Sequence, residues 1–124
     1  MFGMLKPQLQ PVSAKTAAYT VLVTDLGTFF TTRGNGGSLT FTLPATSGLP
    51  TGWWCEFFNA AAQTMVVTSS GSSDDLTTFN DLTADSITFS TSSELIGASV
   101  KVLWDGTGWC CQLMTEETQT ATIA

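Results

Sequence analysis

Hydrophobic and polar residues alternate along much of this 124-residue chain, which is the pattern of half-buried β-strands. The run 38–43 shows it most clearly, because Leu39, Phe41 and Leu43 point to one side and threonines to the other. The run 86–90 repeats the pattern, with Ile87 and Phe89 on one side. Such alternation predicts strands with one face in a core and one face toward water.

The run 99–113 predicts a β-hairpin. Residues 105–108 read Asp-Gly-Thr-Gly, and Asp and Gly tolerate the left-handed backbone of a tight turn. With the turn placed there, Trp104 and Trp109 face each other across the two strands and set their register. Val100 and Val102 share the face of Trp104, and Lys101 and Leu103 point to the other face.

Further strands are expected at 19–23, 28–32, 52–59, 63–68 and 76–79. The strand 52–59 carries large residues on both faces, so we expect one face in the core and the other on a partner or a covering loop. Eight or nine short strands at close spacing predict an all-β fold, a compact antiparallel β-sandwich or barrel.

Three segments are expected in the chain. Residues 1–17 form an extended N-terminal arm, residues 18–115 the β-domain, and residues 116–124 a polar C-terminal tail. The arm is too apolar for a solvated tail, which indicates docking on a neighbouring molecule, and a frayed N-terminus is the alternative. The residues expected to dock are Phe2, Met4, Leu5, Leu9 and Val12.

The charge of the chain narrows its partners. Only 11% of the residues are charged and the net charge is −6, so the chain lacks the basic stripe that nucleic acids require. No apolar stretch approaches the length of a membrane span, and the start does not resemble a secretion signal. We therefore expect neither a nucleic acid nor a membrane as partner.

The chemistry of catalysis is sparse in this sequence. With no histidine, the usual general base near neutral pH and the Ser-His-Asp triad are excluded. The aspartates at 74, 75, 81 and 85 lack the order of a calcium loop and are expected to be solvated turn residues. The three cysteines lack the spacing of a zinc site or a disulfide framework and are expected to fill apolar space. We therefore expect that the protein is not an enzyme and that it binds neither a metal nor a cofactor.

The aromatic residues offer two interpretations. They pack in the core or at a subunit interface, or they provide flat faces on which sugar rings stack. Alternation directs Trp109 and one of Trp53 and Trp54 to the core. The candidates for a subunit interface or a ligand surface are Trp53, Trp54, Phe58 and Trp104.

The order of strands and turns resembles a β-module of tailed bacteriophages that recurs in head decoration (capsid cement) proteins, head fibres and tail fibres. The resemblance rests on residues 18–27, 39–44, 49–60, 65–68 and 98–109, which include the Ala-Tyr-Thr-Val start and the Trp-Asp-Gly-Thr-Gly-Trp turn. It implies a homotrimer on the outer surface of the phage head, assembled in the host cytoplasm, with the major capsid protein as partner.

Two functions follow from this resemblance. The first is a virion structural protein, a decoration protein that stabilises the head, and the chain is too short to add the long shaft of a fibre. The second is a short head-fibre or tail-fibre adhesin that binds glycans of the host surface through exposed aromatics and the polar loops at 69–85.

Overall fold

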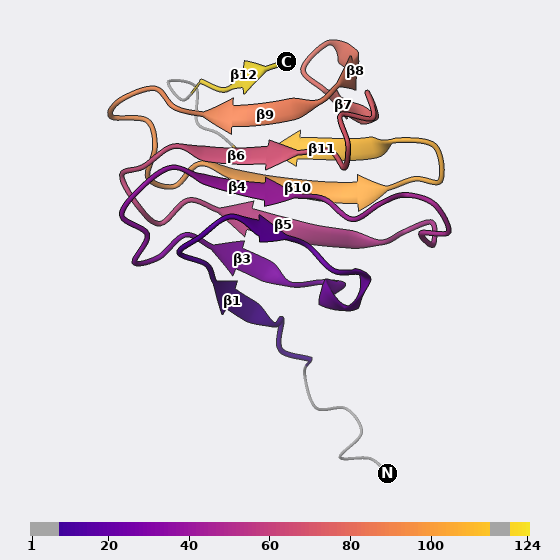
Figure 1. Cartoon of the computed structure of the whole chain (residues 1–124), viewed down its shortest axis with the longest axis horizontal. Helices are drawn as coiled ribbons and strands as arrows, with labels where there is room; N and C mark the ends of the chain where they lie inside the picture. Colours follow the sequence, from indigo (N-terminus) through magenta and orange to yellow (C-terminus); the bar gives the residue numbers. More distant parts are fainter. Residues whose placement is uncertain (1–7, 115–119) are drawn as a thin grey trace.

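The computed structural model describes residues 8–114 and 120–124, and it shows two β-sheets packed face to face (Figure 1). The seven-stranded sheet has the order β1-β3-β5-β10-β11-β7-β8 and the five-stranded sheet the order β12-β9-β6-β4-β2. The larger sheet consists of β1 (Val12–Ala14), β3 (Phe29–Thr31), β5 (Trp54–Phe58), β7 (Leu76–Thr78), β8 (Asp81–Ala84), β10 (Ser99–Trp104) and β11 (Trp109–Leu113). The smaller sheet consists of β2 (Tyr19–Thr20), β4 (Leu39–Thr42), β6 (Met65–Thr68), β9 (Ser86–Phe89) and β12 (Thr122–Ile123).

The core lies between the two sheets and follows the alternation of the sequence. Leu39, Phe41, Ile87 and Phe89 of the smaller sheet are fully buried, as the pattern predicts. Across the core, the ring of Phe41 lies 4.8 Å from that of Phe57 on β5, centroid to centroid. The predicted all-β sandwich is therefore confirmed.

The strand pairing corrects the expected antiparallel arrangement, because both sheets are mixed. β1, β3 and β5 run parallel to one another in one sheet, and β2, β4 and β6 run parallel in the other. The chain enters the two sheets alternately over this region, so two strands that neighbour each other in a sheet are separated by a return strand in the opposite sheet. Parallel neighbours are the result. Every antiparallel pair includes a strand from the second half of the chain, for example β10 with β11 and β10 with β5.

The predicted hairpin is present at β10 and β11, and Trp104 pairs directly with Trp109. Asp105 closes the turn: its Oδ1 accepts hydrogen bonds of 2.8 Å from the backbone N–H groups of Thr107 and Gly108. Gly106 has a φ of 97°, a backbone conformation that favours glycine. The burial of Val100 and Val102 agrees with the predicted faces.

The strand expected at 19–23 ends at Thr20, and a short 3-10 helix, η2 (Val23–Asp25), follows. The carboxylate of Asp25 causes this bend, because its Oδ2 accepts hydrogen bonds from the hydroxyl of Tyr19 (2.7 Å) and from the backbone N–H of Leu22 (2.8 Å). A side chain that captures nearby backbone groups competes with a strand ladder.

The sheets contain more strands than the eight or nine expected, and two of the additional strands lie near the ends of the chain. β1 lies within the expected arm and forms an edge of the larger sheet, and β12 lies within the expected tail and pairs with β9 (Figure 1). β8 is a third addition, formed by part of the polar stretch at 69–85. These strands are two to four residues long, too short for their alternation to be distinguished from a loop.

Candidate interaction surface

The side of the seven-stranded sheet that faces away from the other sheet is the main candidate for a functional surface, and we call it the outer face. Its side chains come from five adjacent strands. They include Val12, Phe29, Trp54, Glu56, Phe58, Lys101, Leu103, Cys110 and Gln112. No strand of the described residues lies over this face.

The period of the strands places these residues together. In β5 the inner positions Cys55 and Phe57 are fully buried, so Trp54, Glu56 and Phe58 point outward. The strand register then aligns the outward residues of neighbouring strands: Glu56 lies between Phe29 of β3 and Lys101 of β10, and Lys101 lies next to Gln112 of β11. Polar side chains therefore cross the middle of the outer face.

Apolar side chains flank this polar row on both sides. Trp54, Leu103 and Cys110 form the adjacent row on one side, and Phe58 lies on the other. The ring of Phe58 stacks on Phe29 with 5.8 Å between centroids. All five side chains are half-buried, although they lie outside the core.

Trp54 is held in place by contacts on two sides. The ammonium of Lys101 lies 4.8 Å from the centre of the indole, close enough for a cation–π interaction. Gly27 also contacts Trp54, and its N–H donates a 2.8 Å hydrogen bond to the backbone carbonyl of Trp54. A Cβ at Gly27 would lie 3.6 Å from the indole, and the φ of 76° also favours glycine there. The ring is therefore oriented before any partner arrives.

The segment that precedes β1 is tied to the edge of the outer face. The amide nitrogen of Gln10 donates hydrogen bonds to Oε1 of Glu56 (2.6 Å) and to the carbonyl of Gly27 (3.1 Å). Beyond this anchor, Leu9 is 89% exposed and Val12 on β1 is 67% exposed. Of the residues predicted to dock, Phe2, Met4 and Leu5 lie outside the described residues.

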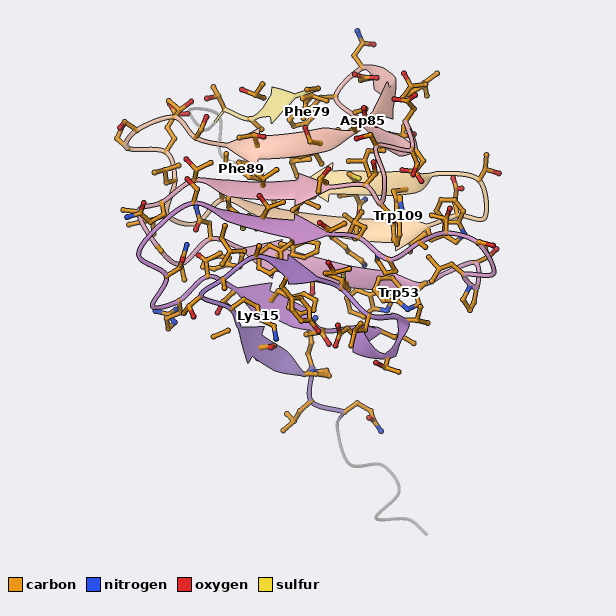
Figure 2. The ribbon with its side chains drawn as sticks, in the orientation of Figure 1. Lys15, Trp53, Phe79, Asp85, Phe89 and Trp109 are labelled. Atoms are coloured by element: carbon orange, nitrogen blue, oxygen red, sulfur yellow. The ribbon has the colours of Figure 1, made fainter. Side chains whose placement is uncertain are left out.

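The four aromatic candidates from the sequence separate into two groups. Trp54 and Phe58 lie on the outer face, whereas Trp53 and Trp104 are only 3% and 7% exposed and belong to the core. Trp53 meets Trp109 edge to face, with 5.8 Å between centroids, and its Nε1–H donates to the carbonyl of Val23 at 2.9 Å (Figure 2). The structure corrects the assignment of Trp53 and Trp104 to a contact surface, because the hairpin and the adjoining β5 direct both indoles inward.

Sequence reasoning did not select Phe29 and Leu103 as surface candidates. Both carry a signal in the sequence. Phe29 precedes Phe30, and two consecutive aromatic residues in a strand must point to opposite faces. Leu103 lies between two residues whose side chains are directed inward, Val102 and Trp104.

The thiols of this protein are poor nucleophiles at neutral pH. Burial raises the pKa of Cys111 to about 12 and also raises the pKa of Cys55. Cys110 is more accessible, but partial burial raises its pKa, and so does the hydrogen bond from its Sγ to Oδ2 of Asp105 at 3.3 Å. Thiols held protonated in this way fill space rather than react.

Asp74, Asp75 and Asp85 lie together where β7 begins and β8 ends, and Asp81 lies at the tip of the β7–β8 hairpin. Oδ1 of Asp85 accepts a 2.8 Å hydrogen bond from the backbone N–H of Asp74, and repulsion from the Asp85 carboxylate raises the pKa of Asp74. Burial raises the pKa of Asp75. Within residues 8–114 and 120–124, no group of three or more Cys, Asp or Glu is arranged to hold a metal ion.

The chain matches no model of a known protein family and no curated protein. No helix among the described residues is long and apolar enough to cross a membrane.

Proposed function

We propose that this protein is a structural component of a bacteriophage virion, a decoration protein that binds the outer surface of the capsid as a homotrimer and stabilises the head. The phage-module resemblance of residues 18–113 supplies the virion context of this proposal. The outer face of the seven-stranded sheet supplies the contact surface. Its partner is the major capsid protein or another copy of this chain.

One observation carries the proposal: the outer face presents ordered aromatic and aliphatic side chains on a rigid sheet. Trp54, Phe58 and Leu103 are half-buried in the single chain and have no covering strand among the described residues. Apolar side chains fixed on adjacent strands suit binding by shape, because little side-chain entropy is lost when they are covered.

The charge of the outer face favours a protein partner as well. The chain as a whole carries −6, yet this face carries one acid, Glu56, and one cation, Lys101. A nearly neutral surface is not repelled by an acidic neighbour, including another copy of this chain. Mixed aromatic and polar composition is typical of protein interfaces.

The size of the outer face explains why a trimer is part of the proposal. Five strands at about 4.8 Å spacing and about five residues at about 3.3 Å give a footprint of roughly 400 Å². A stable interface needs about 800 Å² per partner. One copy would therefore bind weakly, and three linked copies would bind tightly through avidity.

The proposal is tested by adding the purified protein to expanded capsids of the phage that encodes it and measuring co-sedimentation. We expect wild-type protein to saturate the capsids in multiples of three copies. The variant Trp54→Ser/Phe58→Ser should fold but lose most of this binding. Leu82→Ser is a matched control, because Leu82 is 77% exposed at the opposite edge of the sheet and its loss should leave binding unchanged.

A second test addresses the arm. Deleting residues 1–9 removes Leu9 and keeps both Gln10, which anchors the segment, and strand β1. If the arm docks on the capsid, the truncated protein remains folded and binds capsids less tightly. If the truncated protein binds capsids as tightly as the wild type, the arm does not contact the capsid. A wild-type protein that never binds capsids would overturn the proposal as a whole.

Glycan binding is the second candidate, and the exposed part of Trp54 favours it. Its indole is oriented by Lys101 and Gly27 on a flat sheet, which suits stacking against a sugar ring. An array of host-surface glycans would show binding by the wild type that Trp54→Ala abolishes. Absence of binding, or binding that Trp54→Ala leaves intact, contradicts this candidate.

A further inference from the structure

We propose that β1 is an exchangeable strand: the edge of β3 binds residues 10–15 of its own chain or the same residues of a second copy. Neighbouring copies would then associate by trading β1. The inference concerns the backbone pairing of β1 with β3 at the edge of the larger sheet, whereas the proposed function concerns the side chains of the outer face. Its test uses no capsid, so its failure and the failure of the proposed function are distinguishable.

The first support is the weak attachment of β1. No side chain of this strand is buried: Val12 is 67% exposed, Ala14 is exposed, and Ser13 is half-buried. Ser13 lies in the row of Phe30 and Phe57, so a small polar residue occupies the edge position of an otherwise aromatic inner row. Strands with so little burial open locally far more readily than the rest of a fold.

Polar contacts supply most of the attachment, and all can re-form between two copies. The backbone N–H of Phe29 donates to the carbonyl of Pro11 at 2.8 Å, and the N–H of Lys15 donates to the carbonyl of Thr31 at 2.9 Å. Gln10 adds its hydrogen bonds to Glu56 and Gly27. A second copy's residues 10–15 carry the same groups in the same order, so exchange keeps every one of these bonds.

The second support is that β3 does not depend on β1 for its position. β3 pairs with β5 along its whole length, and its inward residue Phe30 is fully buried. The ring of Phe30 lies 5.5 Å from that of Phe57 and 5.6 Å from that of Phe41. When β1 leaves, β3 therefore remains as an ordered edge strand with unpaired backbone groups, which is a binding site for an added strand.

The connection from β1 to β2 can act as the hinge. Between Lys15, the last exchanged residue, and Tyr19 it consists of Thr16, Ala17 and Ala18, which are exposed. Lys15 holds this connection through its ammonium, 3.8 Å from the centre of the Tyr19 ring. A short hinge of this kind favours exchange over independent motion. Fully extended, four residues span about 14 Å, so only a copy lying directly beside this edge can receive the strand.

Among the described residues, no strand covers this edge (Figure 1). β1 is the outermost strand at its end of the larger sheet, and β8 and β12 lie at the opposite end of the molecule (Figure 1). Lys15 marks the β1 side in Figure 2, far from Phe79 and Asp85. The aspartates at 74, 75, 81 and 85, in and around β7 and β8, are therefore remote from the exchanging edge, and their charge does not oppose the approach of a second copy there.

The test uses two variants that each carry one introduced cysteine in a Cys110→Ser background, which removes the most accessible natural thiol and leaves the buried Cys55 and Cys111. Val12 and Phe29 are directly paired and lie on the same face, so a short bis-maleimide can join cysteines at these two positions. Val12→Cys protein carrying a tag is mixed with untagged Phe29→Cys protein and then cross-linked. Exchange places Cys at position 12 of one copy in direct register with Cys at position 29 of another.

The matched control mixes Val12→Cys with Leu82→Cys, because Leu82 is highly exposed and lies on the opposite edge strand. Exchange predicts at least about tenfold more hetero-dimer from the 12–29 mixture than from the 12–82 mixture, because a binding site raises the local concentration of its partner group above that of random collision. The 12–29 product should also increase with protein concentration. Equal yields from the two mixtures would overturn the proposal.

A measurement on the wild-type chain covers the case in which Phe29→Cys does not fold. Hydrogen exchange at the backbone amides of Phe29 and Lys15 reports the opening of β1, since both donate across the β1–β3 pair. We expect these amides to exchange at least about a hundredfold faster than that of the buried Trp104, whose N–H donates to the carbonyl of Trp53 at 2.8 Å. Comparable protection of the three amides would contradict an exchangeable β1.

Discussion

Trp53 and Trp54 are neighbours in the chain, and their indoles lie on opposite faces of the seven-stranded sheet. Trp53 packs against Trp109 in the core, whereas Trp54 lies on the outer face beneath the ammonium of Lys101. The same residue type therefore serves stability at one position and a candidate contact surface at the next.

The two indoles should respond differently to truncation. Trp53→Ala leaves a cavity and removes the hydrogen bond to the carbonyl of Val23, so we expect it to lower the free energy of unfolding by about 3–5 kcal/mol. Trp54→Ala removes a half-buried ring and one cation–π contact, so its effect on stability should be clearly smaller. Urea denaturation measures both, and equal losses would contradict the assignment of Trp54 to a surface.

The side chains that point into the core could be predicted from the sequence, because successive side chains of a strand alternate between its two faces. Trp104 and Trp109 flank a turn whose Asp and Gly residues mark its position, so the sequence also predicted that the two tryptophans pair. The sheet to which each strand belongs could not be predicted from the sequence, because the parallel pairing of β3 with β5 depends on β4 crossing to the other sheet between them. The outward position of Trp54 rather than Trp53 depended on the same long-range pairing.

The tip of the β7–β8 hairpin stores backbone strain. Phe79 has a φ of 38° and Asn80 a φ of 67° between the paired residues Thr78 and Asp81, and a bulky residue is unfavourable in that conformation. Because Phe79 is 59% exposed, little packing is lost when it is replaced. Phe79→Asn should therefore raise the free energy of unfolding by about 1 kcal/mol.

Thermal denaturation of Phe79→Asn provides the measurement, with Leu82→Asn as its control. Leu82 is also highly exposed but does not have a positive φ, so its replacement should leave the melting temperature nearly unchanged. A decrease for Phe79→Asn, or an equal increase for both variants, would show that strain is not the cause.

The carboxylates of Asp74 and Asp75 oppose folding at neutral pH. Repulsion by Asp85 raises the pKa of Asp74, and burial raises that of Asp75, so the folded chain binds protons more readily than the unfolded chain. The contribution of these two groups to the free energy of unfolding therefore falls as pH rises from their ordinary pKa values through the raised ones. Asp85→Asn, which keeps an acceptor for the N–H of Asp74, should stabilise the protein at pH 7.

The stabilisation by Asp85→Asn should shrink as the pH falls and Asp74 and Asp75 take up protons in the wild type. Urea denaturation of both proteins across the acidic range tests this, and a difference that does not change with pH would exclude repulsion as its source.

Asp105 should show the opposite dependence. Hydrogen bonds from the backbone N–H groups of Gly108 and Thr107 lower the pKa of its carboxyl, so its contribution to stability is present above the ordinary pKa and is lost as pH falls through the lowered one. Asp105→Asn should therefore destabilise the hairpin at neutral pH and approach the wild type in acid. Denaturation curves at the two pH extremes measure the effect, and a destabilisation that persists in acid would show that the charge of Asp105 is not involved.

Tyr19 offers a direct probe of the bend after β2, because it is the single tyrosine of the chain. Its hydrogen bond to the carboxylate of Asp25 is the largest cause that raises its pKa to about 12. Ultraviolet absorbance of the phenolate should show this value in the wild type and a value nearer the ordinary one in Asp25→Asn. Lys15→Gln is the control, because it removes the ammonium over the Tyr19 ring and keeps the hydrogen bond, so the Tyr19 pKa should stay high.

Since the neutral phenol of Tyr19 is favoured in the folded chain, the stability that its hydrogen bond to Asp25 contributes should fall as pH rises from the ordinary pKa of about 10 toward 12. A wild-type phenol that titrates at its ordinary value would show that Asp25 does not hold the bend in solution.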